Sequence, residues 1–295
     1  MGNKSFSIIV PTYGRPKGLG NCLKALSRLN YPPDNFEVIV VDDGSETHLS
    51  HVCEPFQNKV NIKLISQPNS GPAAARNKGA EHAKGRFLAF TDDDCIPLPN
   101  WLNLMEVHLN ERPDCAVAGK MVNVFPENPY SMSSQILIDF LHDYYNKKSN
   151  GAKFLTTSSL GVSAKEFREI GGFDTSFPRA AAEDRDFCAR WLHSGKKVVF
   201  DSNIRVQHGS MLSMNTYLKQ HFNYGRGAFR FHEKCSLRGQ WSFRVEPLVF
   251  YKGLFLYPIF TQNVKSKAYV LFLLFVSQVA NTLGFWWEKI NRNKN

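Results

Sequence analysis

Three consecutive carboxylates, Asp92, Asp93 and Asp94, stand almost directly after the apolar run at residues 87–90. Carboxylates packed this closely repel one another and destabilise a fold unless something compensates their charge. The apolar run predicts a buried strand, and in an open α/β sheet ligands bind at the carboxyl ends of the strands. The simplest compensator is a divalent cation, and hard oxygen ligands favour Mg²⁺ or Mn²⁺. The sequence therefore predicts a cation site at this strand end.

Two earlier predicted strands also end in polar or acidic residues. The first leads into Pro11 and Thr12, and the second, at residues 36–41, leads into Asp42 and Asp43. Helical segments alternate with these strands, a pattern that predicts parallel βαβ units. Because the carboxyl ends of parallel strands meet at one edge of a sheet, the first hundred or so residues are expected to build a single ligand crevice.

The middle of the chain is less regular. We expect a strand at residues 115–121, a helix at 135–145 and a turn at 171–174. A further helix opens near residues 180–186, and extended segments follow before His208. A carboxylate pair, Glu183 and Asp184, stands at the start of that helix, where negative charge also suits the helix dipole.

Charge and cysteine content limit the partners and the compartment. The formal net charge is +10, which favours anionic partners such as nucleotides or an acidic membrane surface. Lys and Arg are spread without a long basic block, so no nucleic-acid partner is indicated.

The 6 cysteines form no CxxC pair, and no secretory signal is recognisable before the first strand, which predicts a reduced, cytosolic setting. Cys95 is a poor ligand candidate because soft sulfur does not suit a hard ion.

The last third of the chain is strongly apolar at residues 247–260 and 268–287. The second segment is long enough to span a bilayer, although polar residues interrupt it, and Trp286 and Trp287 fit an interfacial anchor. Basic residues flank it on both sides, so a single span would place one basic flank outside, against the positive-inside tendency. We therefore expect a peripheral or monotopic membrane contact, with two buried core helices as the alternative.

Five motifs, in order, resemble family 2 glycosyltransferases of the GT-A fold. They are residues 9–13, 41–45, 71–77 and 91–94, and then 171–174 followed by Glu183-Asp184. The resemblance implies a GT-A catalytic domain at 1–210, with a Rossmann-like, mostly parallel α/β sheet. It divides into a nucleotide-sugar-binding half at 5–115 and an acceptor-side half at 116–210. An apolar helical extension at 211–295 lies outside the resemblance.

The resemblance also assigns roles to individual residues. Asp43 would accept a hydrogen bond from the base or ribose, Asp92 would face ribose or sugar, and Asp93 receives no separate role. Asp94 would hold Mg²⁺ or Mn²⁺, with His208 as a further candidate ligand, and Asp184, beside Glu183, would be the catalytic base. The full set of expected donor-binding residues is Pro11, Thr12, Tyr13, Arg15, Asp43, Asn69, Gly71, Arg76, Asp92 and Asp93.

The implied activity is inverting transfer of a sugar from a UDP-, GDP- or dTDP-sugar to a glycan or lipid-linked acceptor, on the cytoplasmic side of a membrane. The alternatives are a sugar-nucleotide nucleotidyltransferase and a non-catalytic carbohydrate-binding protein. The first needs a Gly-rich, basic phosphate loop, for which residues 11–16 are a poor substitute. A dehydrogenase is disfavoured because no GxGxxG follows the first strand.

Each candidate also has a purely structural interpretation. The three aspartates can be a solvated turn or helix cap, and residues 42–45 an ordinary turn. Arg76 can be a surface helix residue, and His208 a structural hydrogen-bonding group. Asp186 is an alternative base, although it lies on another helix face from Asp184.

Overall fold

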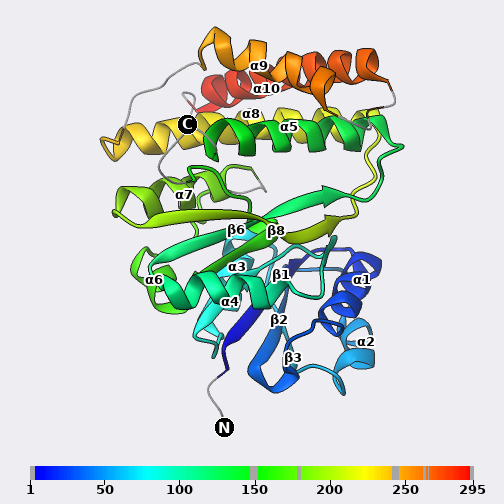
Figure 1. Cartoon of the computed structure of the whole chain (residues 1–295), viewed down its shortest axis with the longest axis vertical. Helices are drawn as coiled ribbons and strands as arrows, with labels where there is room; N and C mark the ends of the chain where they lie inside the picture. The colour runs from blue at the N-terminus through cyan, green and yellow to red at the C-terminus, as the bar shows by residue number, and fades with distance from the viewer. Residues whose placement is uncertain are drawn as a thin grey trace.

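The computed structural model describes residues 4–146, 152–177, 181–240, 246–261, 264 and 266–292. Within these ranges an 8-stranded mixed sheet has the order β3-β2-β1-β4-β7-β6-β8-β5 (Figure 1). The predicted α/β class is confirmed. Helices cover both faces of the sheet, and a separate layer of long helices lies beyond one face (Figure 1).

The first half of the chain forms the parallel part of the sheet. Its strands are β1 (Phe6–Thr12), β2 (Phe36–Asp42), β3 (Ile62–Ser66) and β4 (Phe87–Phe90). Neighbouring strands among these four run parallel, as predicted. The connections contain α1 (Pro16–Leu26), α2 (Ser50–Cys53), α3 (Pro72–Glu81) and two short 3₁₀ turns, Pro33–Asn35 and Glu54–Phe56. β1, β2 and β4 are buried along their whole length because helices pack on both faces.

The second half adds antiparallel strands to this sheet. Its elements are β5 (Cys95–Pro97), α4 (Trp101–Glu111), β6 (Cys115–Asn123), α5 (Pro129–Asn146), a 3₁₀ turn (Thr157–Ser159), β7 (Leu160–Ser163), α6 (Ala164–Glu169), α7 (Glu183–His193) and β8 (Lys197–His208). β7 runs antiparallel to β4 and β6, whereas β6 and β8 are parallel. The extended segments before His208 belong to one strand, β8, whose pairing with β6 shifts register after Gly119.

Two apolar cores hold the helices to the sheet. α1 and α4 pack on the face that carries Phe6, Ile8 and Val10. α3, α6 and α7 pack on the opposite face, against Leu88 and Phe90. This arrangement fixes the strands whose carboxyl ends carry the predicted site.

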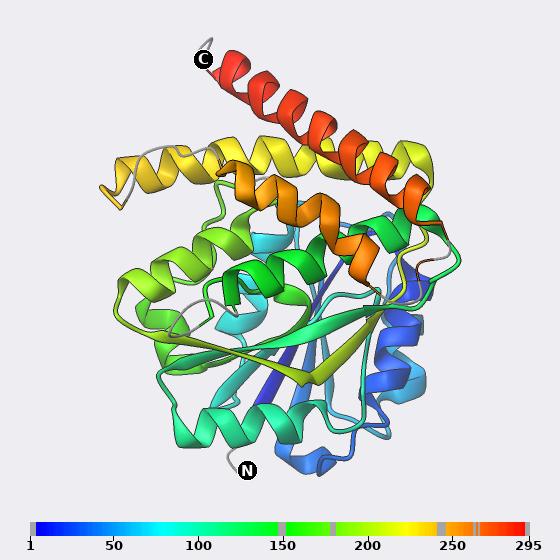
Figure 2. The same ribbon diagram turned by 45° about the horizontal axis from the view of Figure 1, so that its top comes forward.

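The C-terminal part forms a helical layer of α8 (Met214–Leu237), α9 (Leu248–Phe260) and α10 (Lys267–Arg292). α5 joins this layer, and its Phe140 packs in one cluster with Phe250 and Leu254 of α9 and Leu274 of α10. α9 and α10 cross over α5 and α8 on the side away from the sheet (Figure 2). α10 is the one helix of the described residues long and apolar enough to cross a membrane.

α10 has two different faces. The face toward α8 is buried, and the helices approach most closely where Gly225 meets the Asn281 carbonyl and Gly284 meets the Phe222 carbonyl. Glu288 on the same face is buried and ion-paired with Arg226. The opposite face is an exposed apolar stripe of Phe272, Phe275, Val279, Leu283, Trp286 and Ile290. The structure thus differs from the alternative of fully buried core helices.

Candidate active site

The polar strand ends meet at one edge of the sheet, as predicted. Thr12 at the end of β1 donates its hydroxyl to Asp93 Oδ2 at 2.7 Å, and its carbonyl accepts the Asp43 amide at 2.9 Å. Asp93 is fully buried, and burial raises its pKa to about 6 even though Arg15 and Thr12 oppose the shift. Asp93 therefore stabilises the acidic turn through its contacts with Thr12 and Arg15. It does not line the cavity described below.

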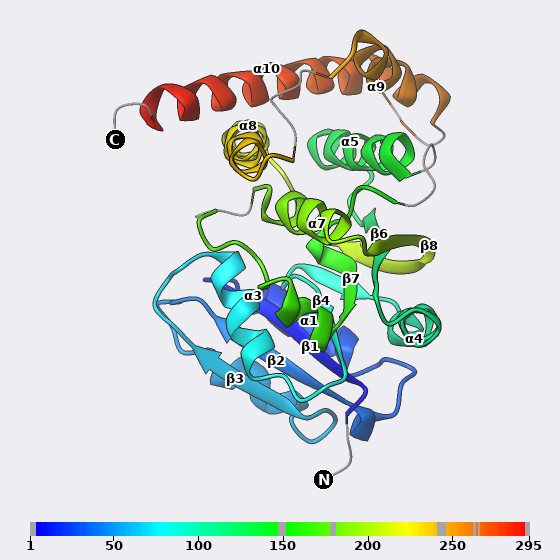
Figure 3. The ribbon, with the colours of Figure 1, turned by 90° about the vertical axis from the view of Figure 1, so that its left-hand side faces the viewer.

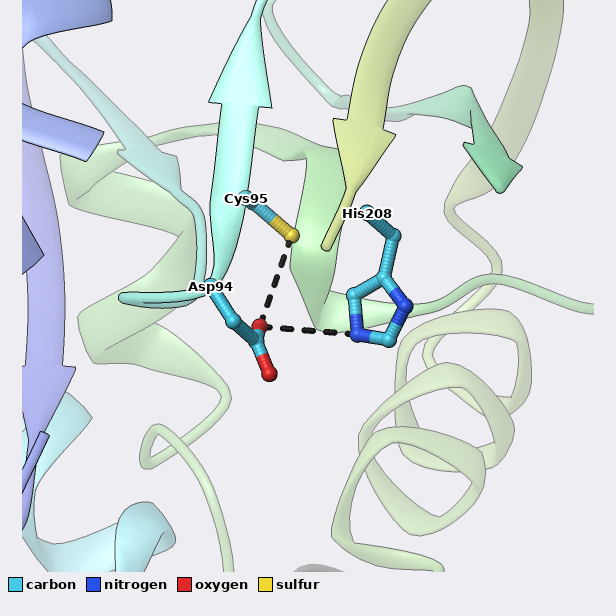
Figure 4. Close-up of side chains that lie close together, drawn as sticks. All are labelled: Asp94, Cys95 and His208. Atoms are coloured by element: carbon cyan, nitrogen blue, oxygen red, sulfur yellow. Dashed lines mark hydrogen bonds and ion pairs between the residues drawn. The ribbon is translucent and has the colours of Figure 1, made fainter. Parts of the chain in front are cut away.

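Asp94 and His208 lie side by side (Figure 4), with Nε2 3.5 Å from Oδ1. Pairing of β5 with β8, with Cys95 opposite His208, brings the two together. Burial disfavours the ionised form of Asp94, but the hydrogen bond and charge of His208, with Arg15, outweigh burial and lower the pKa to about 2. Burial likewise opposes protonation of His208, yet Asp94 raises its pKa.

The donor set at this position fits a divalent cation. Ligand atoms of Asp94, Cys95 and His208 lie within 4.8 Å of one another. Carboxylate oxygen and imidazole nitrogen suit Mn²⁺ and related ions. The buried Cys95 thiol has a pKa raised well above its usual value, mainly by burial, so it stays protonated and is not a suitable ligand.

Arg15 covers the acidic turn from the solvent side. Its guanidinium lies 2.8 Å from Asp93 Oδ1 and 2.7 Å from Asp94 Oδ2. The Arg15 side chain remains half exposed, as does its neighbour Tyr13. The compensating charge that the aspartate triplet requires is therefore partly supplied by the chain itself.

Asp43 organises the loop before α3. Its Oδ1 accepts hydrogen bonds from Gln67 Nε2 at 2.7 Å and the Ser70 amide at 2.9 Å, and its Oδ2 accepts the Gly71 amide at 2.8 Å. These bonds fix Ser70 and Gly71 against the end of β2, and the exposed Asn69 lies against Gly44 in the same turn. A contact of Asp43 with a nucleotide stays a prediction.

Arg76 links the acidic turn to α7. It is only 3% exposed, which excludes the surface-residue interpretation. Its Nη2 donates to Asp92 Oδ1 at 2.7 Å and its Nη1 to Glu183 Oε1 at 2.9 Å. The adjacent Asn77 exchanges two hydrogen bonds with the backbone of Phe173, at 2.8 and 2.9 Å, so the third and fifth motifs are in direct contact.

The start of α7 presents Asp184. Ala182, just before the helix, has φ of 74°, a left-handed conformation that is costly for a residue with a side chain. Burial, followed by the charge of Glu183, raises the pKa of Asp184 to about 7. Asp186 instead accepts hydrogen bonds from Arg190 at 2.8 Å and Arg238 at 2.6 Å. Both carboxylate oxygens of Asp186 are thus occupied by arginine side chains. The structure does not support Asp186 as the alternative base.

A cavity of about 560 Å³ extends from these carboxylates into the helical layer. Its lining includes Arg76, Asp92, Glu183, Asp184 and His208. The expected base-binding residues near the ends of β1 and β2 are not part of that lining. The cavity therefore lies on the side of the acidic turn away from the ends of β1 and β2.

Much of the cavity wall was not predicted from the sequence. Its α5 and α8 residues include Ser134, Gln220, His221 and Tyr224. None of them belongs to a recognisable motif, and their helices are amphipathic in an ordinary way. They are found only once α8 is seen to lie over the start of α7.

This fold and site define the class: the chain has the GT-A fold of nucleotide-sugar glycosyltransferases. A mannosyltransferase from Pyrobaculum calidifontis, solved with GDP-Man and Mn²⁺, superposes with a TM-score of 0.64 at 16% identity, covering 95% of this chain and 74% of that one. TarS 1–349 of S. aureus, solved with UDP-GlcNAc, superposes with a TM-score of 0.57 at 18% identity, covering 99% of this chain and 92% of that one.

Residues 7–171 match the family model of Glycosyl transferase family 2, and the chain belongs to that family. The match ends before α7, so Asp184 lies outside it. Glycosyltransferase AglE of Haloferax volcanii is 38% identical over 75% of this chain and 72% of its own length. Hyaluronan synthase of Pasteurella multocida is 31% identical over 74% of this chain but 23% of its own length, so the chain spans about a quarter of that relative.

Proposed function

We propose that the protein transfers a sugar from a nucleoside-diphosphate sugar to an acceptor hydroxyl, with inversion at the anomeric carbon. The observation that carries this proposal is Asp184, a carboxylate of raised pKa that faces a cavity beginning at Asp92 and His208. Donor and acceptor would then meet at one point from opposite sides, which direct displacement requires.

On the donor side, Asp94 and His208 would hold a divalent cation, Mg²⁺ or Mn²⁺, which stabilises the charge that develops on the leaving diphosphate. The Mn²⁺ complex of the mannosyltransferase supports this choice. Arg15, already beside Asp94, adds positive charge at the same place. The loop fixed by Asp43, with Tyr13, Asn69 and Gly71, would border the nucleotide.

On the acceptor side, Asp184 removes the proton from the attacking hydroxyl. The acceptor oxygen forms a bond to the anomeric carbon as the bond from that carbon to the diphosphate oxygen breaks, and the electron pair leaves with the nucleoside diphosphate. A positioned base of this kind contributes roughly 10²–10⁴-fold to the rate. Arg76 is ion-paired with both Glu183 and Asp92, and so fixes the start of α7 against the acidic turn.

The decisive measurement is the product released when the protein is incubated with nucleotide sugars and Mn²⁺. Release of nucleoside diphosphate supports glycosyl transfer. Formation or consumption of pyrophosphate would instead identify a nucleotidyltransferase, and donor binding without any release would identify a non-catalytic sugar-binding protein.

The exposed stripe of α10 supports association with the cytoplasmic surface of a membrane. The opposite face of α10 is committed to α8 through Gly284 and the buried Glu288, so the helix lies along the protein instead of crossing a bilayer. Lys289 lies 4.7 Å from the Trp286 ring at the edge of the stripe. Aromatic residues beside cations suit the headgroup region of an anionic membrane.

A further inference from the structure

The cavity beyond Asp184 has a defined construction that the transfer reaction alone does not explain. Viewed along α8, the start of α7 forms its floor, α5 and α8 form its walls, and α10 crosses above (Figure 3). α9 completes the roof with Phe250 and Tyr251. The inference drawn from this cavity rests on the proposed function, because it concerns the acceptor of that reaction.

The inner part of the cavity carries polar groups that lack partners among the described residues. They are Ser134 Oγ on α5, Gln220 Oε1 on α8 and both ring nitrogens of His221. His221 is 1% exposed, and burial lowers its pKa to about 4, so the ring is neutral at pH 7. Buried polar groups without partners are costly unless a ligand satisfies them. Neutral donors and acceptors of this kind match sugar hydroxyls better than they match an anion.

Tyr224 joins these groups to the reacting centre. Its hydroxyl accepts a hydrogen bond from Gln220 Nε2 at 2.6 Å. Burial raises the pKa of Tyr224 to about 12, and the nearby charges of Asp184, Glu183 and Asp92 act in the same direction. The phenol therefore stays protonated, and it is bonded to Gln220 while lying within reach of the charge of Asp184 in the same cavity.

The outer part of the cavity is apolar. Its walls and roof are formed by Leu137, Ile138, Leu141, Phe250, Tyr251, Phe285 and Trp286. Trp286 is 51% exposed and belongs also to the apolar stripe of α10, so the cavity reaches the surface at the face assigned to the membrane. A soluble polysaccharide has little apolar surface to bury against such a wall. Binding of a hydrocarbon chain, in contrast, becomes more favourable with each methylene that is buried.

We propose that the acceptor is an amphiphile, a saccharide head on a hydrocarbon chain. The head is bound by Ser134, Gln220, His221 and Tyr224, and the chain leaves between α5 and α10 past Trp286 toward the bilayer. The volume of about 560 Å³ is sufficient for the head and the first part of the chain. The remainder stays in the membrane, so the acceptor need not leave the lipid phase to reach Asp184.

Calorimetry with the full chain tests this proposal. It compares the binding of octyl and methyl β-glycosides of glucose, galactose and mannose, below the micellar concentration. We expect at least one octyl glycoside to bind at least tenfold more tightly than its methyl counterpart, because its chain buries additional methylenes. Equal binding of the two, or no binding of any octyl glycoside, would overturn the proposal.

Two substitutions locate the binding. His221→Phe keeps the ring contacts with Tyr217 and Tyr224 and breaks no hydrogen bond found among the described residues, so it should leave the melting temperature unchanged or higher. It should weaken octyl-glycoside binding about fivefold, the loss of one hydrogen bond. Ala228→Phe fills the cavity from α8 and should abolish binding, and Ile138→Trp offers the same block from α5 if that variant does not fold.

Ala268→Phe is the matched control, because Ala268 is exposed at the start of α10 and does not line the cavity. Unchanged binding in both blocking variants would overturn the assignment.

Thermal shift with nucleoside diphosphates and Mn²⁺, together with donor hydrolysis, separates the acceptor assignment from the proposed function. If nucleotides act but octyl glycosides do not bind, only the acceptor assignment fails. If nucleotides neither bind nor react, the proposed function itself fails.

Discussion

Arg76 and Glu183 form a buried ion pair, with 2.9 Å between Nη1 and Oε1, that ties helix α3 of the parallel half to the first turn of α7. The same guanidinium holds Asp92 at 2.7 Å. One arginine thus sets the spacing between the strand end assigned to the donor and the carboxylate pair assigned to the acceptor. We therefore expect both stability and activity to depend on the Arg76 side chain.

Replacing Arg76 by Ala leaves two carboxylates unpaired, Glu183 fully buried and Asp92 partly so. Breaking a buried ion pair by removing one partner costs about 3–5 kcal/mol, so Arg76→Ala should lower the free energy of unfolding by that amount in urea titrations. Lys78→Ala on the same helix removes only an exposed pair with Glu81 and should cost less than about 1 kcal/mol. Equal effects in the two variants would contradict the assigned role of Arg76.

Asp94→Asn should remove the part of nucleotide binding that depends on Mn²⁺. The neutral amide is a weaker ligand, and a metal at a leaving phosphate is worth several kcal/mol, so turnover should fall by at least about 100-fold. Nucleoside-diphosphate binding measured with Mn²⁺ and with EDTA checks the prediction. Wild-type Mn²⁺ dependence in Asp94→Asn would place the cation elsewhere.

The pH dependence of transfer should report Asp184. A base works only when ionised, and burial with the charge of Glu183 raises its pKa to about 7. We therefore expect kcat/KM to fall about tenfold per pH unit below pH 7 and to level off above it. Asp184→Asn should retain donor binding, lose about 10²–10⁴-fold in transfer and show no such limb. A wild-type profile that is level from pH 5 to 8 would argue against this base.

The close crossing of α8 and α10 predicts an unusual effect of a single methyl group. A Cβ at Gly284 would overlap the Phe222 carbonyl, so Gly284→Ala should cost about 1–3 kcal/mol despite better helix propensity. Gly20→Ala in α1 meets only Val52 at an ordinary 3.6 Å and should be stabilising by up to about 1 kcal/mol. Urea titration of both variants measures the difference in sign.

The exposed stripe of α10 should mediate vesicle binding. A charge placed there must be desolvated on insertion, so Leu283→Asp should weaken co-sedimentation with vesicles containing anionic lipids at least tenfold. Val107→Asp is the matched control, since Val107 on α4 is 55% exposed but lies outside the helical layer. Parallel losses in both variants, or no vesicle binding by the unaltered protein, would contradict membrane association.

The strand ends could be predicted from the sequence because their signals are local. An apolar run that stops at Thr12 or at Asp92 marks both a strand and the edge where it ends. The pairing of His208 with Asp94 could be anticipated from the family resemblance alone, because it depends on the register of β5 against β8. No local pattern encodes that register.

The cavity wall formed by α8 could not be predicted, for a different reason. His221 and Gln220 lie on a helix whose sequence satisfies ordinary amphipathic rules, and their exceptional property is the lack of partners in the folded protein. Arg76 is similar, since its sequence context of alanines fits a surface helix equally well. Only tertiary packing against α7 turns it into a buried link.

Gly227 of α8 packs directly on the Ala181 carbonyl, next to the left-handed Ala182 that precedes α7. The segment that matches the family ends before this contact. Under the proposed function, the donor site lies within the matched segment, whereas the cavity assigned to the acceptor is lined by α5 from that segment and by α7 to α10, which follow it. Exchange of α5 and the three C-terminal helices together between relatives should therefore change the acceptor and leave the donor unchanged, provided that the glycine on α8 is kept.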